Sequence, residues 1–245
     1  MKSLRLEAKA LLRKVLEEHR ARLPYVSVPA VRAALVNAGA TVQPATVNRY
    51  LVEFLRAGLI HDAGRGWYSS LATPFVLDTH PVEELARLIQ KQFRFLKFSC
   101  WATDQVKPFM HHLLARSVQF VSTEDHALAS AGEFLEGKGF NVYVNPRKSE
   151  AQRFVQIKER TVILRPEHSK APEGHPYASI EKLLVELRGE LDVLKLIDVG
   201  EFHHLAGEVL RQGRIQISAL LSYAEARLFT VEDMLGAEQS IISKE

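Results

Sequence analysis

Helical segments alternate with short apolar runs through the middle of the chain, and this alternation restricts the fold more than any other feature. The segments expected to be helical are PVEELARLIQKQF, TDQVKPFMHHLLAR and EDHALASAGEFLEGKG. Those expected to be extended are FRFLKFSCW, SVQFVS, FNVYVNP and RTVILRP. Because crossover helices bury the faces of short apolar strands, this order predicts an α/β layer with a largely parallel or mixed sheet. The stretch that follows is expected to form several short helices, broken near Gly189, Gly200 and Gly213.

The first 70 residues have a different pattern. Apolar residues at helical spacing predict an amphipathic helix over residues 3–20. Ser27 is a suitable N-cap for a second helix that ends at Gly39, and a third is expected to run from Pro44 to Gly58. The segment LIHDAGRGWYSS then reads as two short strands around a glycine-rich tip. This order predicts a winged helix-turn-helix.

Turn residues and prolines in SSLATPFVLDTHP indicate a domain boundary at residues 70–80. The predicted organisation is therefore a winged helix-turn-helix over residues 1–72 and an α/β domain over residues 80–245. The predicted fold class is α/β (α+β), with a mixed sheet and a helical C-terminus in the second domain.

Charge is divided unevenly between these regions. The formal net charge is +3, yet residues 1–70 contain 11 Lys and Arg against 5 Asp and Glu, while the remainder contains 21 against 24. A basic N-terminal module on a mildly acidic body is typical of a nucleic-acid-binding segment.

The third predicted helix carries residue types that suit a DNA contact. Off its apolar stripe lie Thr46, Asn48 and Arg49, with Gln43 just ahead. Arg can bind guanine O6 and N7, Asn or Gln can pair with adenine, and Thr can contact a phosphate or a thymine methyl. Arg65 stands at the hairpin tip, where flanking glycines would let the backbone approach a phosphate. The alternative is a protein-binding winged helix with solvated arginines.

The sequence contains few residues in the pattern of a catalytic or metal site. Gln156-Ile157-Lys158 has the form of half of a nuclease metal site on a strand, but the preceding run offers Asn145-Pro146 where a carboxylate is needed. The adjacent pairs His111-His112 and His203-His204 lack the i, i+4 spacing of a zinc site, and no P-loop motif is present. We therefore assign no catalytic residue, metal or cofactor. A nuclease or nucleotidyl-transferring effector with a winged-helix targeting domain is the alternative function.

Apolar runs in the sequence bear on cellular location, and the neighbours of the single cysteine bear on its reactivity. The sequence has no run of 18 or more uninterrupted apolar residues, which argues against a membrane span and favours the cytoplasm. Cys100 is the only cysteine, and its neighbours Phe98 and Trp101 predict a small buried side chain with an inert thiol.

The chain also resembles the AbiEi-type antitoxins of bacterial abortive-infection toxin–antitoxin modules. The resemblance covers the N-terminal helices and hairpin and four later segments, of which residues 179–187 are the most characteristic. These segments are FSCWATDQVKPFMHH, NVYVNP, SIEKLLVELRGELDVL and ISALLSYAEAR.

This resemblance implies a transcriptional autorepressor that binds inverted repeats upstream of its own operon, and a C-terminal domain that acts as antitoxin in phage defence. Its functional partner would be a nucleotidyltransferase-like toxin, and repeat operators favour a homodimer. The resemblance assigns DNA contact to the helix around Thr46, Asn48 and Arg49 and to the tip at Arg65.

Overall fold

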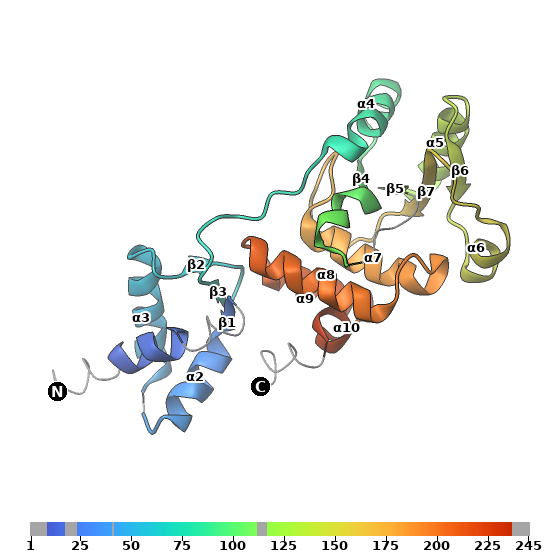
Figure 1. Ribbon diagram of the computed structural model, residues 1–245. Coiled ribbons are helices and arrows are strands. Elements are labelled where there is room, and N and C mark those ends of the chain that lie inside the picture. Colours follow the sequence, from blue (N-terminus) through green and yellow to red (C-terminus); the bar gives the residue numbers. More distant parts are fainter. Residues whose placement is uncertain (1–8, 18–23, 41, 112–116, 237–245) are drawn as a thin grey trace.

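The computed structural model describes residues 9–17, 24–40, 42–111 and 117–236. It is a mixed α/β structure with two sheets. A small unit with a three-stranded sheet lies at one end, and a larger unit with a four-stranded sheet lies at the other (Figure 1). Within the described residues, no helix is long and apolar enough to cross a membrane.

The small unit follows the order helix, strand, helix, helix and hairpin. Residues 9–17 are helical, and the sheet order β1-β3-β2 is antiparallel throughout. The remaining elements are β1 (Tyr25–Ser27), α2 (Val28–Asn37), α3 (Pro44–Arg56), β2 (His61–Asp62) and β3 (Trp67–Ser69). Apolar side chains from the helices and from Val26 and Ile60 form a separate core beneath this sheet.

The predicted boundaries of the second and third helices are confirmed, whereas both ends of the helix predicted over residues 3–20 lie outside the described residues. The Ser27 side chain accepts a hydrogen bond from the Ala30 N–H at 3.1 Å, so it caps α2. Pro44 begins α3, and Gly58 follows that helix with a φ of +67°. Strand β1 was not expected, because three residues between two helices give too short a pattern to identify.

The large unit is built on a mixed sheet in the order β4-β5-β7-β6. The strands are β4 (Phe98–Ala102), β5 (Val118–Thr123), β6 (Asn141–Val144) and β7 (Thr161–Pro166). Strand β4 is antiparallel to β5, whereas β5, β7 and β6 are parallel. The prediction of a mixed sheet is therefore confirmed, and all four predicted strands are present.

Alternating side chains divide this sheet between two cores. Cys100, Val121 and Val162 face α4 (Glu83–Gln92) and α5 (Leu128–Glu136). Trp101 and Phe120 are register partners on the other face and stack with ring centroids 4.0 Å apart. That second face packs on helices that Figure 1 shows between the sheet and the small unit, namely α7 (Ile180–Leu194), α8 (Val199–Gln212), α9 (Ile217–Ala226) and α10 (Val231–Leu235).

Two expectations for this unit are wrong, and one helix was not expected. Residues 103–109 form 3₁₀ turns at Thr103–Gln105 and Lys107–Phe109 instead of a helix. Helix α6 (Lys148–Phe154) was not expected. Gly189 lies inside α7 and does not break it, whereas α7 and α8 are separated at residues 195–198, directly ahead of Gly200, and α8 ends at Gly213. At Gly189 a Cβ would lie 3.2 Å from Nη2 of Arg227, so the glycine allows close packing within a continuous helix.

The two units share part of one core. The Tyr25 ring, from β1, belongs to the same buried cluster as the helices of the large unit. Its hydroxyl donates to the Gly213 carbonyl at 2.8 Å and accepts from the Ile215 N–H at 2.9 Å. The small unit is therefore held by specific buried contacts.

Candidate nucleic-acid interface

Helix α3 presents a polar face because most of its apolar side chains point inward. Val47, Tyr50, Leu51 and Phe54 are buried in the core of the small unit. The opposite face, toward the N-terminal half of the helix, carries the four residues that the sequence predicts. Gln43, Asn48 and Arg49 are exposed and Thr46 is half-buried.

The contacts of these residues leave several polar groups available. Gln43 is the N-cap, but its side chain makes no capping hydrogen bond. The Arg49 guanidinium lies 5.2 Å from the Tyr50 ring centroid and 4.0 Å from the Glu53 carboxylate. The nearer partner of Glu53 is Lys9, at 2.6 Å, and that hydrogen bond lowers the pKa of the Glu53 carboxyl.

Arg32 of α2 belongs to the same surface but is not among the residues predicted from the sequence to contact DNA. Its Nη2 donates to the Asn48 side-chain oxygen at 3.3 Å, and its Nε is buried without an acceptor among the described residues. The sequence signal for this residue is a cation off the apolar stripe formed by Val31 and Leu35. That signal does not identify the partner, because the contact depends on how α2 crosses α3.

The hairpin tip lies against α9 of the large unit. The Arg65 main-chain N–H donates to the Ser218 hydroxyl of α9 at 3.1 Å, and the Arg65 side chain is exposed. A Cβ on Gly64 would overlap the Ser218 side chain. Gly64 therefore serves this contact, whereas a Cβ on Gly66, on the other side of Arg65, would meet nothing within 4 Å.

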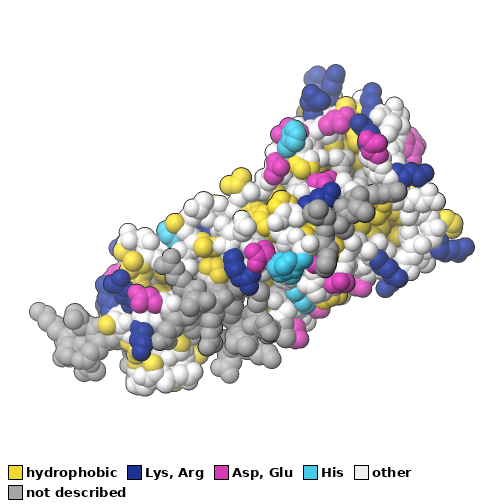
Figure 2. All heavy atoms as spheres, viewed as in Figure 1, with side chains coloured by type: hydrophobic (Ala, Val, Ile, Leu, Met, Phe, Trp, Pro, Cys, Tyr) yellow, Lys and Arg dark blue, Asp and Glu magenta, His cyan; other side chains and the backbone are white. Residues whose placement is uncertain are grey.

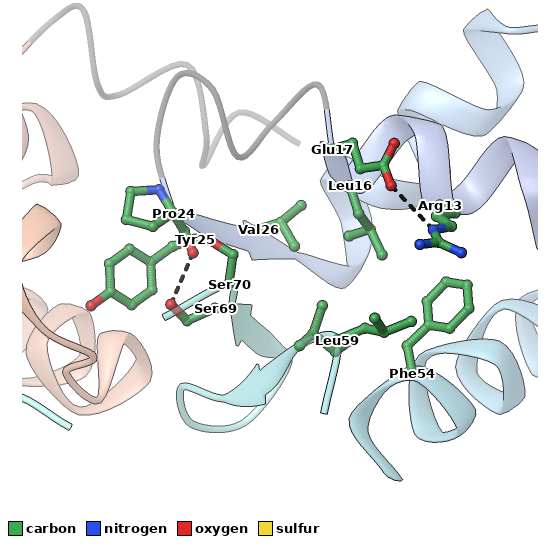
Figure 3. Close-up of a pocket in the computed structure, with 11 residues that line it drawn as sticks. Arg13, Leu16, Glu17, Pro24, Tyr25, Val26, Phe54, Leu59, Ser69 and Ser70 are labelled. Carbon is green, nitrogen blue, oxygen red and sulfur yellow. Dashed lines mark hydrogen bonds and ion pairs between the residues drawn. The ribbon is translucent and has the colours of Figure 1, made fainter. Parts of the chain in front are cut away.

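A hollow on the small unit lies between the helix over residues 9–17, β1 and the end of α3 (Figure 3). Its lining is largely apolar, and its charged groups Arg13 and Glu17 pair with each other at 3.1 Å. The Ser69 hydroxyl donates to the Pro24 carbonyl at 2.9 Å. These polar groups stabilise the fold.

A second polar cluster lies between the sheet and α7. The Lys182 ammonium is buried and donates to the Ser99 hydroxyl at 2.6 Å and to the Glu167 carboxylate at 2.5 Å. A serine paired with lysine can act as a nucleophile when the amine is neutral and can accept a proton. Here the same Lys182 ammonium also donates to the Glu167 carboxylate, so this arrangement is that of an ion pair.

Four other charged side chains of α7 also contact other segments of the large unit. Each contacts a different segment, so α7 connects the sheet to the C-terminal helices. The pairs are Glu181 with the Gln216 N–H, Glu186 with Arg227, Arg188 with Asp233, and Glu190 with Arg165.

The residues that resemble half of a nuclease metal site do not lie on a strand. Gln156 and Lys158 lie in the loop ahead of β7, where the Gln156 carbonyl accepts from the Asn141 side chain at 3.0 Å. Asn145 accepts from Arg165 at 3.3 Å. Within the described ranges, no group of three or more His, Cys, Asp or Glu is placed to hold a metal ion. The premise of the nuclease interpretation is therefore wrong for these residues.

The remaining reactive side chains have structural contacts. His111 stacks on His204 with ring centroids 3.5 Å apart, and His203 Nε2 lies 3.0 Å from the Asp233 carbonyl. His112 lies outside the described residues. Cys100 is buried as expected, and burial raises the pKa of its thiol to about 12. This thiol is therefore protonated at neutral pH.

Comparison with known proteins gives one family. The chain belongs to DUF6577, a family of unknown function, whose model matches residues 46–235. The match begins inside α3 and includes the hairpin and the large unit through α10. No curated protein matches the chain.

Proposed function

We propose that this member of DUF6577 is a DNA-binding transcriptional regulator whose small unit is a winged helix-turn-helix. The observation that carries the proposal is the polar face of α3, where Gln43, Thr46, Asn48 and Arg49 lie together above a buried apolar stripe. A recognition helix in this arrangement can enter the major groove with its N-terminal residues toward the bases.

Two further features support this proposal. The small unit has helices followed by a hairpin, and this element order supports the winged-helix proposal. Helix α3 lies on the side of this unit away from α9 (Figure 1). Its first turn contains no acidic residue, so the positive end of the helix dipole is free to attract phosphate.

The contacts also suggest how α3 would read a base. Arg49 has the fork geometry that grips guanine O6 and N7. The Asn48 oxygen accepts from Arg32, so the amide group left for a base is a donor. A donor alone pairs with an acceptor such as N7 or thymine O4. In the proposed complex Arg32 then both orients Asn48 and adds positive charge near the backbone.

The wider role is proposed on the resemblance to AbiEi-type antitoxins. In that role the chain binds inverted repeats upstream of its own operon as a homodimer, represses that operon in the cytoplasm, and counteracts a nucleotidyltransferase-like toxin. A reading frame for such a toxin beside this one, and restored growth when both are expressed, would support the antitoxin role. Unrelieved toxicity would oppose it.

Fluorescence anisotropy with duplex DNA from upstream of the operon tests DNA binding. We expect Arg49→Ala to cost about 1–3 kcal/mol of binding free energy and to relax the preference at one base pair. Arg65→Ala is expected to weaken binding to all sequences more uniformly, because a phosphate contact carries no base information.

Arg153→Ala is the matched control, since Arg153 is an exposed arginine on α6 in the large unit. Its affinity should equal that of the wild type. Unchanged affinity in both Arg49→Ala and Arg65→Ala would show that these residues do not contact DNA. Equal losses in Arg49→Ala and Arg153→Ala would indicate non-specific attraction.

A further inference from the structure

Four unpaired cations surround the end of α4. Residues 85–103 contain Arg87, Lys91, Arg94 and Lys97 but no Asp or Glu. All four are exposed, and none forms an ion pair within the part of the chain that the structure describes. Figure 2 shows Lys and Arg side chains at this end of the molecule, where α4 ends in Figure 1. A cluster of cations that are not held in ion pairs attracts polyanions.

A rigid turn between α4 and β4 holds an aromatic ring among these cations. The Leu96 N–H donates to the Phe93 carbonyl at 3.2 Å, so Arg94 and Phe95 are the central residues of the turn. Phe93 and Leu96 pack into the core beneath α4, and the Phe93 ring contacts Phe134 edge-on at 5.6 Å. Phe95 points outward and is 98% exposed.

We propose that this turn, defined by Lys91, Arg94, Phe95 and Lys97, binds single-stranded nucleic acid. An exposed phenylalanine supplies a face on which a base can stack, and the cations supply partners for the backbone phosphates. Because Phe93 and Leu96 already fix the turn, little conformational entropy is lost on binding. In a duplex the base faces are stacked on one another and unavailable to this ring.

The surface is separate from α3. Figure 1 places α3 and the α4–β4 turn at opposite ends of the molecule. The exposed residues beside the turn include Gln90 and Gln92, so the face lacks the apolar stripe of a membrane-binding helix. The proposal thus goes beyond operator binding and does not depend on it.

Anisotropy with fluorescein-labelled oligo(dT) and oligo(U) of 20 nucleotides tests the proposal on the full chain. We expect Phe95→Ala to weaken binding about 5-fold to 150-fold, the range for loss of one stacked base. Lys91→Ala with Arg94→Ala should reduce the slope of log affinity against log salt by about 0.7 for each cation.

The control is Phe154→Ala with Arg153→Ala on α6. Phe154 is 62% exposed and Arg153 lies 5.1 Å from its ring centroid, so this pair matches the chemistry of the turn at another place. The control should bind like the wild type. Phe95 is fully on the surface, and an unchanged thermal unfolding curve would show that Phe95→Ala folds normally.

Three results would overturn the proposal. The first is absence of oligonucleotide binding at low salt, or equal affinity of Phe95→Ala and wild type. The second is loss of oligonucleotide binding in Arg49→Ala alone, which would assign it to α3. The third is Phe95-dependent binding to phosphatidylserine vesicles without binding to either oligonucleotide, which would make the turn a membrane contact. Failure of operator binding would leave these measurements unaffected.

Discussion

The Lys182–Glu167 pair is asymmetric in its exposure to water. The lysine side chain is 1% exposed, whereas the glutamate side chain is 33% exposed. Glu167→Ala leaves a buried ammonium without its counter-charge, and we expect it to cost about 3–5 kcal/mol of unfolding free energy. Lys182→Met leaves a carboxylate that water can reach and fills the space with an apolar chain, so about 1–2 kcal/mol is expected.

Urea unfolding at pH 7, followed by circular dichroism, measures both costs. Arg211→Ala is the control, because its ion pair with Glu208 is exposed on both sides, at 49% and 35%. It should change the unfolding free energy by less than about 1 kcal/mol. A larger loss in Lys182→Met than in Glu167→Ala would contradict the assignment of Lys182 as the more buried partner.

Substituting two glycines of the β2–β3 hairpin distinguishes the cost of backbone strain from the cost of a packing overlap. Gly64 and Gly66 both have positive φ, at +96° and +79°. A Cβ on Gly66 meets nothing within 4 Å, so Gly66→Ala should cost about 1–2 kcal/mol from strain alone. A Cβ on Gly64 overlaps Ser218, so Gly64→Ala should cost more than Gly66→Ala in the same urea assay.

A double-mutant cycle isolates the packing component. Ser218→Gly removes the overlapping side chain and should recover part of the loss in Gly64→Ala but none of the loss in Gly66→Ala. We expect a coupling energy of about 1 kcal/mol or more between positions 64 and 218. A coupling energy near zero would show that the hairpin does not contact α9 in solution.

Elements with a strong periodic pattern could be predicted from the sequence. The apolar stripe of Val47, Leu51 and Phe54 predicts both the helix and the face that it turns to solvent. The exposure of Asn48 and Arg49 could therefore be predicted from that stripe. What could not be predicted depends on contacts distant in sequence. The sequence gives no local sign that Gly64 meets α9, that α2 meets Asn48, or that Gly189 is tolerated inside a buried helix.

At the scale of the whole molecule, Tyr25 joins the two units. Its hydroxyl bonds to Gly213 and Ile215, and its ring lies in the core of the large unit. Burial raises the pKa of Tyr25 from 10.0 to about 12. The folded state therefore keeps this proton when the unfolded chain has lost it. The resulting stabilisation is complete below pH 10 and disappears as the pH rises through 12.

Tyr25→Phe should weaken the connection between the units. It leaves the Gly213 carbonyl and the Ile215 N–H buried without partners, so we expect a loss of about 1–3 kcal/mol near pH 7. Between pH 10 and 12 the wild type should lose up to about 2 kcal/mol more than the variant, since only the wild type ionises at this position. Urea unfolding across this pH range measures both effects. Limited proteolysis within residues 70–79 should be faster in the variant, whereas equal cleavage and parallel pH profiles would mean that Tyr25 does not hold the units together.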